Sequence, residues 1–207
     1  MTTKPPKNGL HTIYHKNDQK SEEGKYKDDK KEGKWTTWNI KGEKTTEGKY
    51  KNGKKEGKWI KKSINSAEEG KYINDIKEDK WIYWLLGRII NEKYYSNGDS
   101  VREIRFYRDD QKEYEVNKED GNFFSWHKNG QKSSEGSLND KGYFSNKGKE
   151  GQWTYWYENG QIKSEGNYKD GKEDGKMTWW YENGQIKEEA NYKDGKQDGK
   201  WTEWHEN

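Results

Sequence analysis

Several residues have the types and spacings that could support chemistry. His11 and His15 form an H-x-x-x-H pair, the spacing at which two histidines on one face of a helix bind zinc. Carboxylates such as Glu165, Glu173 and Asp174 are of the type that transfers protons in acid–base catalysis. Gly-Lys pairs, which occur in phosphate-binding loops, are frequent. The chain has no cysteine, so thiol nucleophiles, thiolate zinc sites and disulfides are excluded.

These candidate residues recur at fixed places in a repeat, whereas a catalytic residue is expected to be unique. The histidines stand where other units have an aromatic ring: His15, His127 and His205 in the slot of Tyr157 and Tyr181, and His11 in the slot of Trp153. No G-x-x-x-x-G-K-[ST] follows a strand, and the D-x-D-x-D-G calcium pattern is absent from the sequence. We therefore expect the carboxylates to lie in turns or on a solvated face. We expect no catalytic residue, no metal site, no cofactor and no enzyme activity.

The repeat has a period of 24 residues in its regular parts. Residues 168–191 read YKDGKEDGKMTWWYENGQIKEEAN, and residues 192–207 begin the same string again. The first large residue of each W-T-x-W cluster marks the slot, from the C-terminus backwards: Trp201, Met177, Trp153, Phe123, Ile104, Trp81, Trp59, Trp35 and His11. We expect one repeat array over residues 1–207, regular at 1–84, irregular at 85–147 and regular again at 148–207.

Each unit reads as one β-hairpin. Residues 153–157 (WTYWY) favour a strand, and Asn159-Gly160 is the dipeptide typical of a type I′ turn. Residues 161–168 (QIKSEGNY) alternate as a return strand does. Asp170-Gly171 and Asp174-Gly175 are then expected to turn the chain back, because both dipeptides tolerate left-handed backbone conformations.

The composition predicts a fold held together by aromatic rings. Leu, Ile, Val and Phe number only 22 of 207 residues, which excludes an aliphatic core, but 12 Trp and 15 Tyr and a net charge of only +3 argue against disorder. Ala and Leu are scarce and Gly is abundant, which argues against helices. We predict an all-β, elongated, single-layer antiparallel sheet of tandem hairpins. One packed row is expected to be structural: Trp35, Trp59, Trp81, Trp153 and Trp201.

The units resemble the second variety of MORN repeat, whose pattern runs close to Y-x-D-G-K-x-D-G-K-W-T-x-Y-Y-x-N-G-x-I-K-x-E-G-N. Residues 151–207 match this pattern almost throughout, with further matches at 14–33, 49–59 and 121–136 and a weak match at 85–118. Bacterial proteins made of such repeats look like the YwqK family, commonly labelled antitoxins or immunity partners of secreted toxins. The resemblance implies a non-catalytic protein that binds and neutralises a toxin.

Other functions compete with this interpretation. Exposed aromatic rows could stack on sugars, choline-like head groups, single-stranded nucleic acid or a protein loop. The G-x-W and W-Y pairs are also similar to choline-binding cell-wall repeats, although the D-G-K and E-N-G-Q-I-K segments fit MORN units better. A cell-envelope or carbohydrate-binding module and a membrane-associated scaffold therefore remain alternatives to the protein-binding role.

Charge and hydropathy bear on partners and location. Residues 1–62 hold 18 Lys and 9 acidic residues, so the remainder is acidic and suits a basic partner such as a nuclease toxin. The lysines alternate with acids, which favours a solvated face over sequence-specific nucleic-acid binding. The longest apolar stretch, residues 81–90, is too short to span a bilayer, and residues 1–10 lack a signal-peptide pattern. We expect a cytoplasmic location, or an envelope or secreted one if a signal was removed.

Recognition is expected where the repeat is broken. All four arginines of the chain fall between residues 85 and 118, where turn signals thin out, and arginine is enriched at interface hot spots. A second break lies near residues 139–147, and simple repeat decay is the alternative explanation for both. The predicted partner-binding residues are Arg102, Arg105, Tyr107 and Arg108 with Trp84, Trp126 and Trp156.

Overall fold

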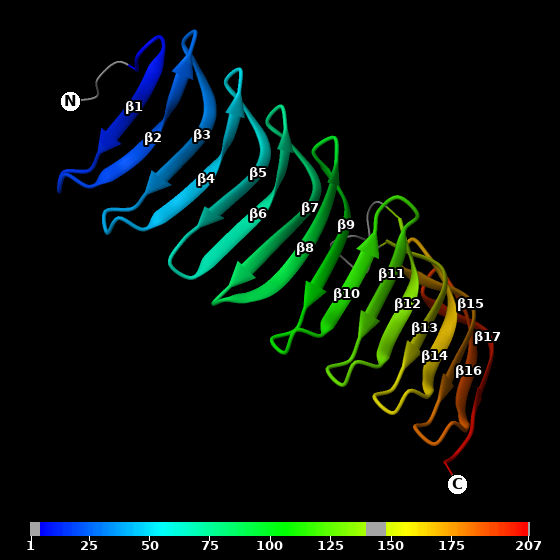
Figure 1. The fold of residues 1–207 in the computed structure, drawn as a ribbon. Helices are drawn as coiled ribbons and strands as arrows, with labels where there is room; N and C mark the ends of the chain where they lie inside the picture. The colour runs from blue at the N-terminus through cyan, green and yellow to red at the C-terminus, as the bar shows by residue number, and fades with distance from the viewer. Residues whose placement is uncertain (1–4, 140–147, 207) are drawn as a thin grey trace. The chain divides into compact units, whose positions relative to one another are not determined.

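The computed structural model describes residues 5–139 and 148–206 (Figure 1). The chain divides after Val101 into two compact units, called unit 1 and unit 2 below. The described residues form strands, turns and loops and contain no α-helix. Part of the expected second break, residues 140–147, lies outside the described residues.

Consecutive strands pair antiparallel, in chain order, within each unit. The strands of unit 1 are β1 (Gly9–Tyr14), β2 (Lys20–Lys27), β3 (Lys30–Trp38), β4 (Lys44–Lys51), β5 (Lys54–Lys62), β6 (Ser66–Ile73), β7 (Ile76–Leu85) and β8 (Arg88–Ser96). Strand β9 (Asp99–Phe106) begins in unit 1 and continues into unit 2. The further strands of unit 2 are β10 (Lys112–Asn117), β11 (Asn122–Trp126), β12 (Lys132–Leu138), β13 (Lys149–Trp156), β14 (Ile162–Lys169), β15 (Lys172–Trp180), β16 (Ile186–Lys193) and β17 (Lys196–Glu203). The prediction of an all-β fold made of tandem antiparallel hairpins is confirmed.

Two kinds of turn alternate along the chain, one at each edge of the sheet. Asp170-Gly171 is a tight type I′ turn, with φ of 49° and 80°. At the opposite edge, residues 157–161 form a wider loop in which Gly160 has a φ of 85° but Asn159 is not in the positive-φ region. There Asn159 Oδ1 accepts a hydrogen bond of 2.9 Å from the Gln161 amide. The assignment of Asn159-Gly160 to a type I′ turn was therefore wrong, because the asparagine side chain stabilises a longer loop instead. We call this second edge the loop edge.

The dipeptide Asp174-Gly175 is not a turn. It lies inside β15, where Gly175 has a φ of 112°. Met177 pairs with Gly166 and Glu173 pairs with Tyr168, so three residues of β15 lie opposite one residue of β14. The expected turn is thus a β-bulge, which bends the strand without reversing it. Residues with positive φ occupy the same place in the other long strands: Gly33, Gly57, Asp79, Gly151 and Gly199.

Beside these bulges, an indole ring lies directly on a glycine of the preceding strand. A Cβ atom added to Gly48 would lie 2.2 Å from the Trp59 ring, and one added to Gly70 would lie 2.2 Å from the Trp81 ring. The Trp59 Nε1–H donates a hydrogen bond of 3.1 Å to the carbonyl of Lys49, the residue after the glycine. The glycine therefore provides both the space for the ring and the position of its hydrogen-bond acceptor. The same arrangement holds for Gly24 with Trp35 and for Gly136 with Trp153.

The packed rings of unit 1 form one continuous row. Trp35 and Trp81 are only 3% and 2% exposed, because tyrosines contact both sides of each indole edge-to-face. Adjacent ring centroids lie 5.0 to 6.4 Å apart along the row, in the order His11, Tyr26, Trp35, Tyr50, Trp59, Tyr72, Trp81 and Tyr95. Such contacts contribute about 0.5–1.5 kcal/mol each beyond area burial. We call the side of each unit that carries these indoles and Trp153 the core face.

Trp201 departs from this arrangement. It pairs in register with Ala190, in a place where other units have glycine. The Ala190 side chain is 2% exposed and occupies the space over which an indole would lie. Trp201 is 49% exposed, and its Nε1–H donates to Glu188 Oε1 at 2.8 Å instead of to a backbone carbonyl.

Ile104 does not occupy the tryptophan slot. It pairs with Glu115, whereas Glu103 pairs with Val116 in the way that Trp35 pairs with Gly48. Strand β9 has no positive-φ residue, so it lacks the bulge of the other long strands. Counting from the repeat period therefore placed the tryptophan slot at Ile104, one residue after its position at Glu103. Val116 is 4% exposed and fills the place of the glycine, next to the smaller ring of Phe123.

We expect Gly48→Ala to destabilise the protein, because the added methyl group overlaps the Trp59 ring. The loss of unfolding free energy should be about 1–3 kcal/mol. The matched measurement is a double-mutant cycle with Trp59→Leu, read by thermal or urea unfolding. If Gly48→Ala lowers stability equally with and without the indole, the contact between the Trp59 ring and Gly48 is contradicted.

We also expect cooperative unfolding at alkaline pH. Burial raises the pKa of Tyr50, Tyr72 and Tyr168, and burial with a hydrogen bond to Tyr83 raises the pKa of Tyr95 to about 12. These groups bind protons more tightly in the folded chain, so the stability they contribute is complete below about pH 10 and is lost as pH rises toward the folded values. Tyrosinate absorbance and circular dichroism should change together. Independent ionisation near the ordinary pKa with the fold intact would contradict the prediction.

Candidate functional site

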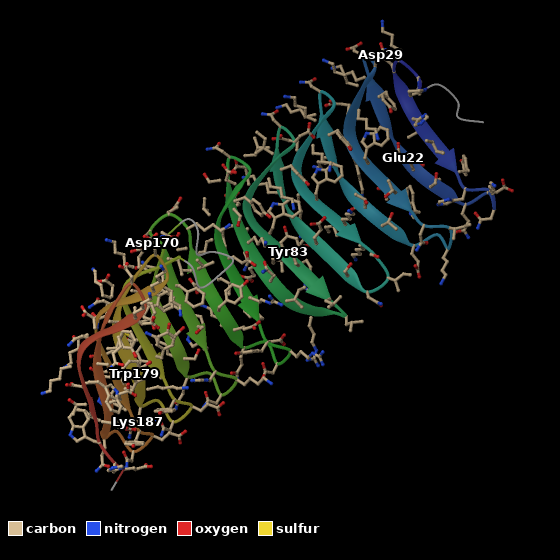
Figure 2. The ribbon with its side chains drawn as sticks, turned by 180° about the vertical axis from the view of Figure 1, so that it is seen from behind. Glu22, Asp29, Tyr83, Asp170, Trp179 and Lys187 are labelled. Atoms are coloured by element: carbon tan, nitrogen blue, oxygen red, sulfur yellow. The ribbon has the colours of Figure 1, made fainter. Side chains whose placement is uncertain are left out.

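The core face carries lysines that lie over its rings. Lys77 Nζ is 3.9 Å from the Trp81 centroid and 5.3 Å from that of Tyr95, and it donates a hydrogen bond of 3.1 Å to the Tyr83 hydroxyl. Lys31 makes the equivalent contact, 3.8 Å from the centroid of Trp35. Figure 2 shows this side of the strands, with Glu22 and Tyr83 labelled among the side chains of unit 1. These cations are held by the rings beneath them and by carboxylates such as Glu22, which is 3.2 Å from Lys31.

Lys149 is the corresponding cation of unit 2. Its Nζ lies 5.0 to 5.2 Å from the centroids of Trp153, Tyr155 and Tyr168, and it donates to the Tyr155 hydroxyl at 2.6 Å. Burial lowers the pKa of Lys149, while burial first and the neighbouring Tyr168 second raise the pKa of Tyr155. Both shifts follow from packing inside the ring cluster, so they are explained without a reaction.

The opposite side of each unit, called the ionic face, carries a regular row of Lys–Glu pairs. Its members are Lys34–Glu47 at 3.2 Å, Lys58–Glu69 at 3.0 Å, Lys80–Glu92 at 2.6 Å and Lys176–Glu189 at 2.6 Å. Hydrogen bonds from Lys44 and then Lys34 lower the pKa of Glu47. Because most of these lysines are well exposed, each pair contributes little to stability. The ionic face is therefore polar, but the positive and negative charges of these pairs neutralise each other.

Arg102 belongs to this row. Its guanidinium donates to Glu115 Oε1 through Nε at 2.9 Å and through a second nitrogen at 2.5 Å. It therefore occupies the slot that Lys34 and Lys80 hold in unit 1. Glu115 already accepts hydrogen bonds from the guanidinium. The position of Arg102 is therefore explained by the repeat as well as by a role in an interface.

The predicted arginine patch is not assembled on one side. Arg105 pairs in register with Tyr114 on the core face and lies 3.3 Å from Glu113. Arg108 lies in the loop at residues 107–111, and Arg102 lies on the ionic face. Arg102 and Arg105 therefore lie on opposite faces of β9.

Trp126 and Trp156 lie on the ionic face of unit 2 and are half-buried. Trp153 and Trp156 lie on opposite faces of β13, as their spacing of three residues predicts. Lys132 Nζ is 5.3 Å from the Trp156 centroid, and Lys112 Nζ is 5.2 Å from that of Trp126. In unit 1, Trp84 is likewise half-buried, at the end of β7. Among the predicted partner-binding residues, Trp126 and Trp156 are thus brought onto the same face of unit 2.

Tyr107 has a structural contact shared by other units. Its hydroxyl donates to the carbonyl of Trp126 at 2.9 Å, as the Tyr157 hydroxyl does to Trp180 at 2.7 Å. His15 and His127 make the same bond through Nε2, to the carbonyls of Trp38 and Trp156. The interpretation of these histidines as members of a tyrosine slot is confirmed. Within residues 5–139 and 148–206, no three His, Cys, Asp or Glu side chains gather as metal ligands would.

The loop edge of unit 1 carries exposed apolar residues that were not predicted from the sequence. Ile40, Ile64 and Leu86 are 58%, 92% and 72% exposed, each in the loop of a different hairpin. The signal was present in the sequence, because Glu158 and Glu182 stand in the regular units at the loop position of Ile40. A groove of about 520 Å³ lies between the loops that carry Ile40 and Ile64.

A family model described as a MORN repeat variant matches residues 149–170 and 173–194. These two segments are similar to MORN repeats. They cover β13, β14 and β16 fully and β15 except Lys172, where the bulges, loops and tight turns are regular. A search of the curated proteins found no match to the chain. In the described part of the chain, no helix has the length and apolarity needed to cross a membrane.

We expect the two tryptophans of β13 to differ in their roles. Trp153→Ala should lower the free energy of unfolding by about 3–5 kcal/mol, because the ring is 2% exposed and packs on Gly136. Trp156→Ala should cost clearly less, because that ring is half-buried on the ionic face. Urea unfolding of both variants provides the comparison. Equal losses would show that both faces are equally structural.

Proposed function

We propose that this chain is a non-catalytic binding protein that neutralises a partner protein, as an antitoxin or immunity protein does. The recognition surface is the ionic face of unit 2, around Trp126 and Trp156. The half-buried state of these two rings, each beside a lysine, is the observation that carries the proposal. Tryptophan is the residue most enriched at interface hot spots, and a partner that covers these rings completes their burial.

The other polar groups of the chain support binding rather than catalysis. Residues of catalytic type such as Glu47, Glu189 and His127 are engaged in contacts that recur from unit to unit, in the Lys–Glu row and in the loop-edge hydrogen bonds. MORN repeats are in general non-catalytic modules that often mediate protein interactions. A surface of this kind offers area and orientation rather than a site where reactive groups converge.

Charge supports a basic partner for unit 2. Residues 102–207 contain 22 acidic and 18 basic residues, whereas residues 1–101 contain 16 acidic and 23 basic residues. A basic toxin is therefore steered toward unit 2 and away from unit 1. The lysines beside Trp126 and Trp156 fit this scheme because carboxylates such as Glu115 and Glu135 lie next to them.

The proposal is tested with the protein encoded next to this chain in its genome. Co-expression should relieve the growth arrest that this neighbour causes, and titration calorimetry should detect a complex. Trp126→Ala/Trp156→Ala should weaken binding by ~10-fold or more while the protein stays folded. Arg102, Arg105 and Arg108, replaced together by lysine, measure whether the guanidinium fork adds to affinity. No complex and no relief of growth arrest would refute the antitoxin role.

A further inference from the structure

The loop edge of unit 1 carries an exposed apolar surface. The binding role proposed for the ionic face of unit 2 does not account for it. Ile40, Ile64 and Leu86 project from three successive hairpins and are more than half exposed. The repeat does not require apolar residues there, since Glu158 and Glu182 serve in equivalent loops of unit 2. Exposed apolar side chains that are grouped on one edge indicate a contact surface.

The loops that carry these residues are held in place. Asn39 Oδ1 accepts hydrogen bonds of 3.0 Å from the amides of Lys41 and Glu43, and Asn39 Nδ2 donates to the Glu43 carboxylate at 2.7 Å. The Ile40 carbonyl accepts a bond of 2.8 Å from Asn17 of the preceding loop. The Leu86 amide donates to the Asn65 carbonyl at 2.7 Å. Because the backbone is fixed, a partner that binds Ile40 or Leu86 orders little additional chain.

The groove between two of these loops combines apolar walls with lysines. Its lining includes Ile40, Ile64, Lys41, Lys44, Lys62 and Glu43, and its volume is about 520 Å³. Lys44 is paired with Glu47 at 2.7 Å, whereas Lys41 and Lys62 make no ion pair with a residue in the described ranges. The groove therefore attracts an apolar side chain flanked by negative charge.

We propose that this edge binds an acidic amphipathic helix of a partner protein. A bulky apolar side chain of the helix enters the groove between Ile40 and Ile64, and its carboxylates pair with Lys41 and Lys62. Successive loops are two strands apart, about 9–10 Å, and seven residues of helix rise by about 10.5 Å. Of two apolar residues seven positions apart, one thus reaches the groove and the other the exposed side chain of Leu86 in the next loop. A flat bilayer has no protrusion to fill such a groove.

The test uses the whole chain and a synthetic peptide of three heptads, with leucine on one face and glutamate beside it. Fluorescence anisotropy should show binding that weakens with salt. Ile40→Ser/Ile64→Ser and Lys41→Glu/Lys62→Glu should each weaken binding by ~10-fold or more. The matched control is Ile73→Ser/Ile76→Ser, at the tight-turn edge of the same unit, where both side chains are also exposed. This control should bind as the unchanged protein does.

Three results would overturn the proposal. They are no binding of the peptide, equal binding of a peptide with lysine in place of glutamate, and tighter binding to phosphatidylserine vesicles than to the peptide. The Trp126→Ala/Trp156→Ala variant should bind the peptide normally. Failure here is therefore separable from failure of the proposed antitoxin role, which is measured with the neighbouring protein and with the ionic face of unit 2.

Discussion

The contact between an indole ring and a glycine supports the rest of this fold. Trp59 lies where a side chain on Gly48 would be, and its N–H reaches the carbonyl of the next residue. The contact needs a bulge in the long strand, and the bulge needs a residue with positive φ such as Gly57. The ring, the glycine and the bulge occur together at Trp35, Trp59 and Trp153. An aromatic core becomes possible in a sheet with few aliphatic residues because tyrosines cover the edges of each indole.

Units that depart from this rule show its physical basis. In β9 the bulge residue is missing, Glu103 stands in the ring slot, and Val116 fills the place of the glycine. Between β16 and β17, Ala190 stands where other units have glycine. The Trp201 ring therefore has no flat backbone surface to pack on and remains half exposed. In β9 all three members change together, whereas at β17 the glycine is lost, the bulge residue Gly199 is kept, and the Trp201 ring is not buried. The variation is therefore constrained by packing, and an irregular unit is not by itself evidence of recognition.

A binding function is expected of residues whose identity is not dictated by packing. The core face is saturated by rings and the lysines above them, and the row of Lys–Glu pairs neutralises much of the ionic face. What remains is the pair of half-buried tryptophans on unit 2 and the apolar loop edge of unit 1. These two surfaces differ in charge, and the two proposals assign them to partners of different chemistry.

The sequence by itself determined the all-β class, the 24-residue hairpin unit and the opposite faces of Trp153 and Trp156, because strand periodicity and turn chemistry are local. The tyrosine-slot role of His15 and His127 was also evident from the repeat. Only the tertiary structure decided that Asp174-Gly175 is a bulge and that Glu103 rather than Ile104 stands in the ring slot, because a bulge or its loss changes the face on which every later residue of the strand lies. The exposure of Ile64 likewise depends on its place beyond the end of a strand, where no neighbouring strand covers it.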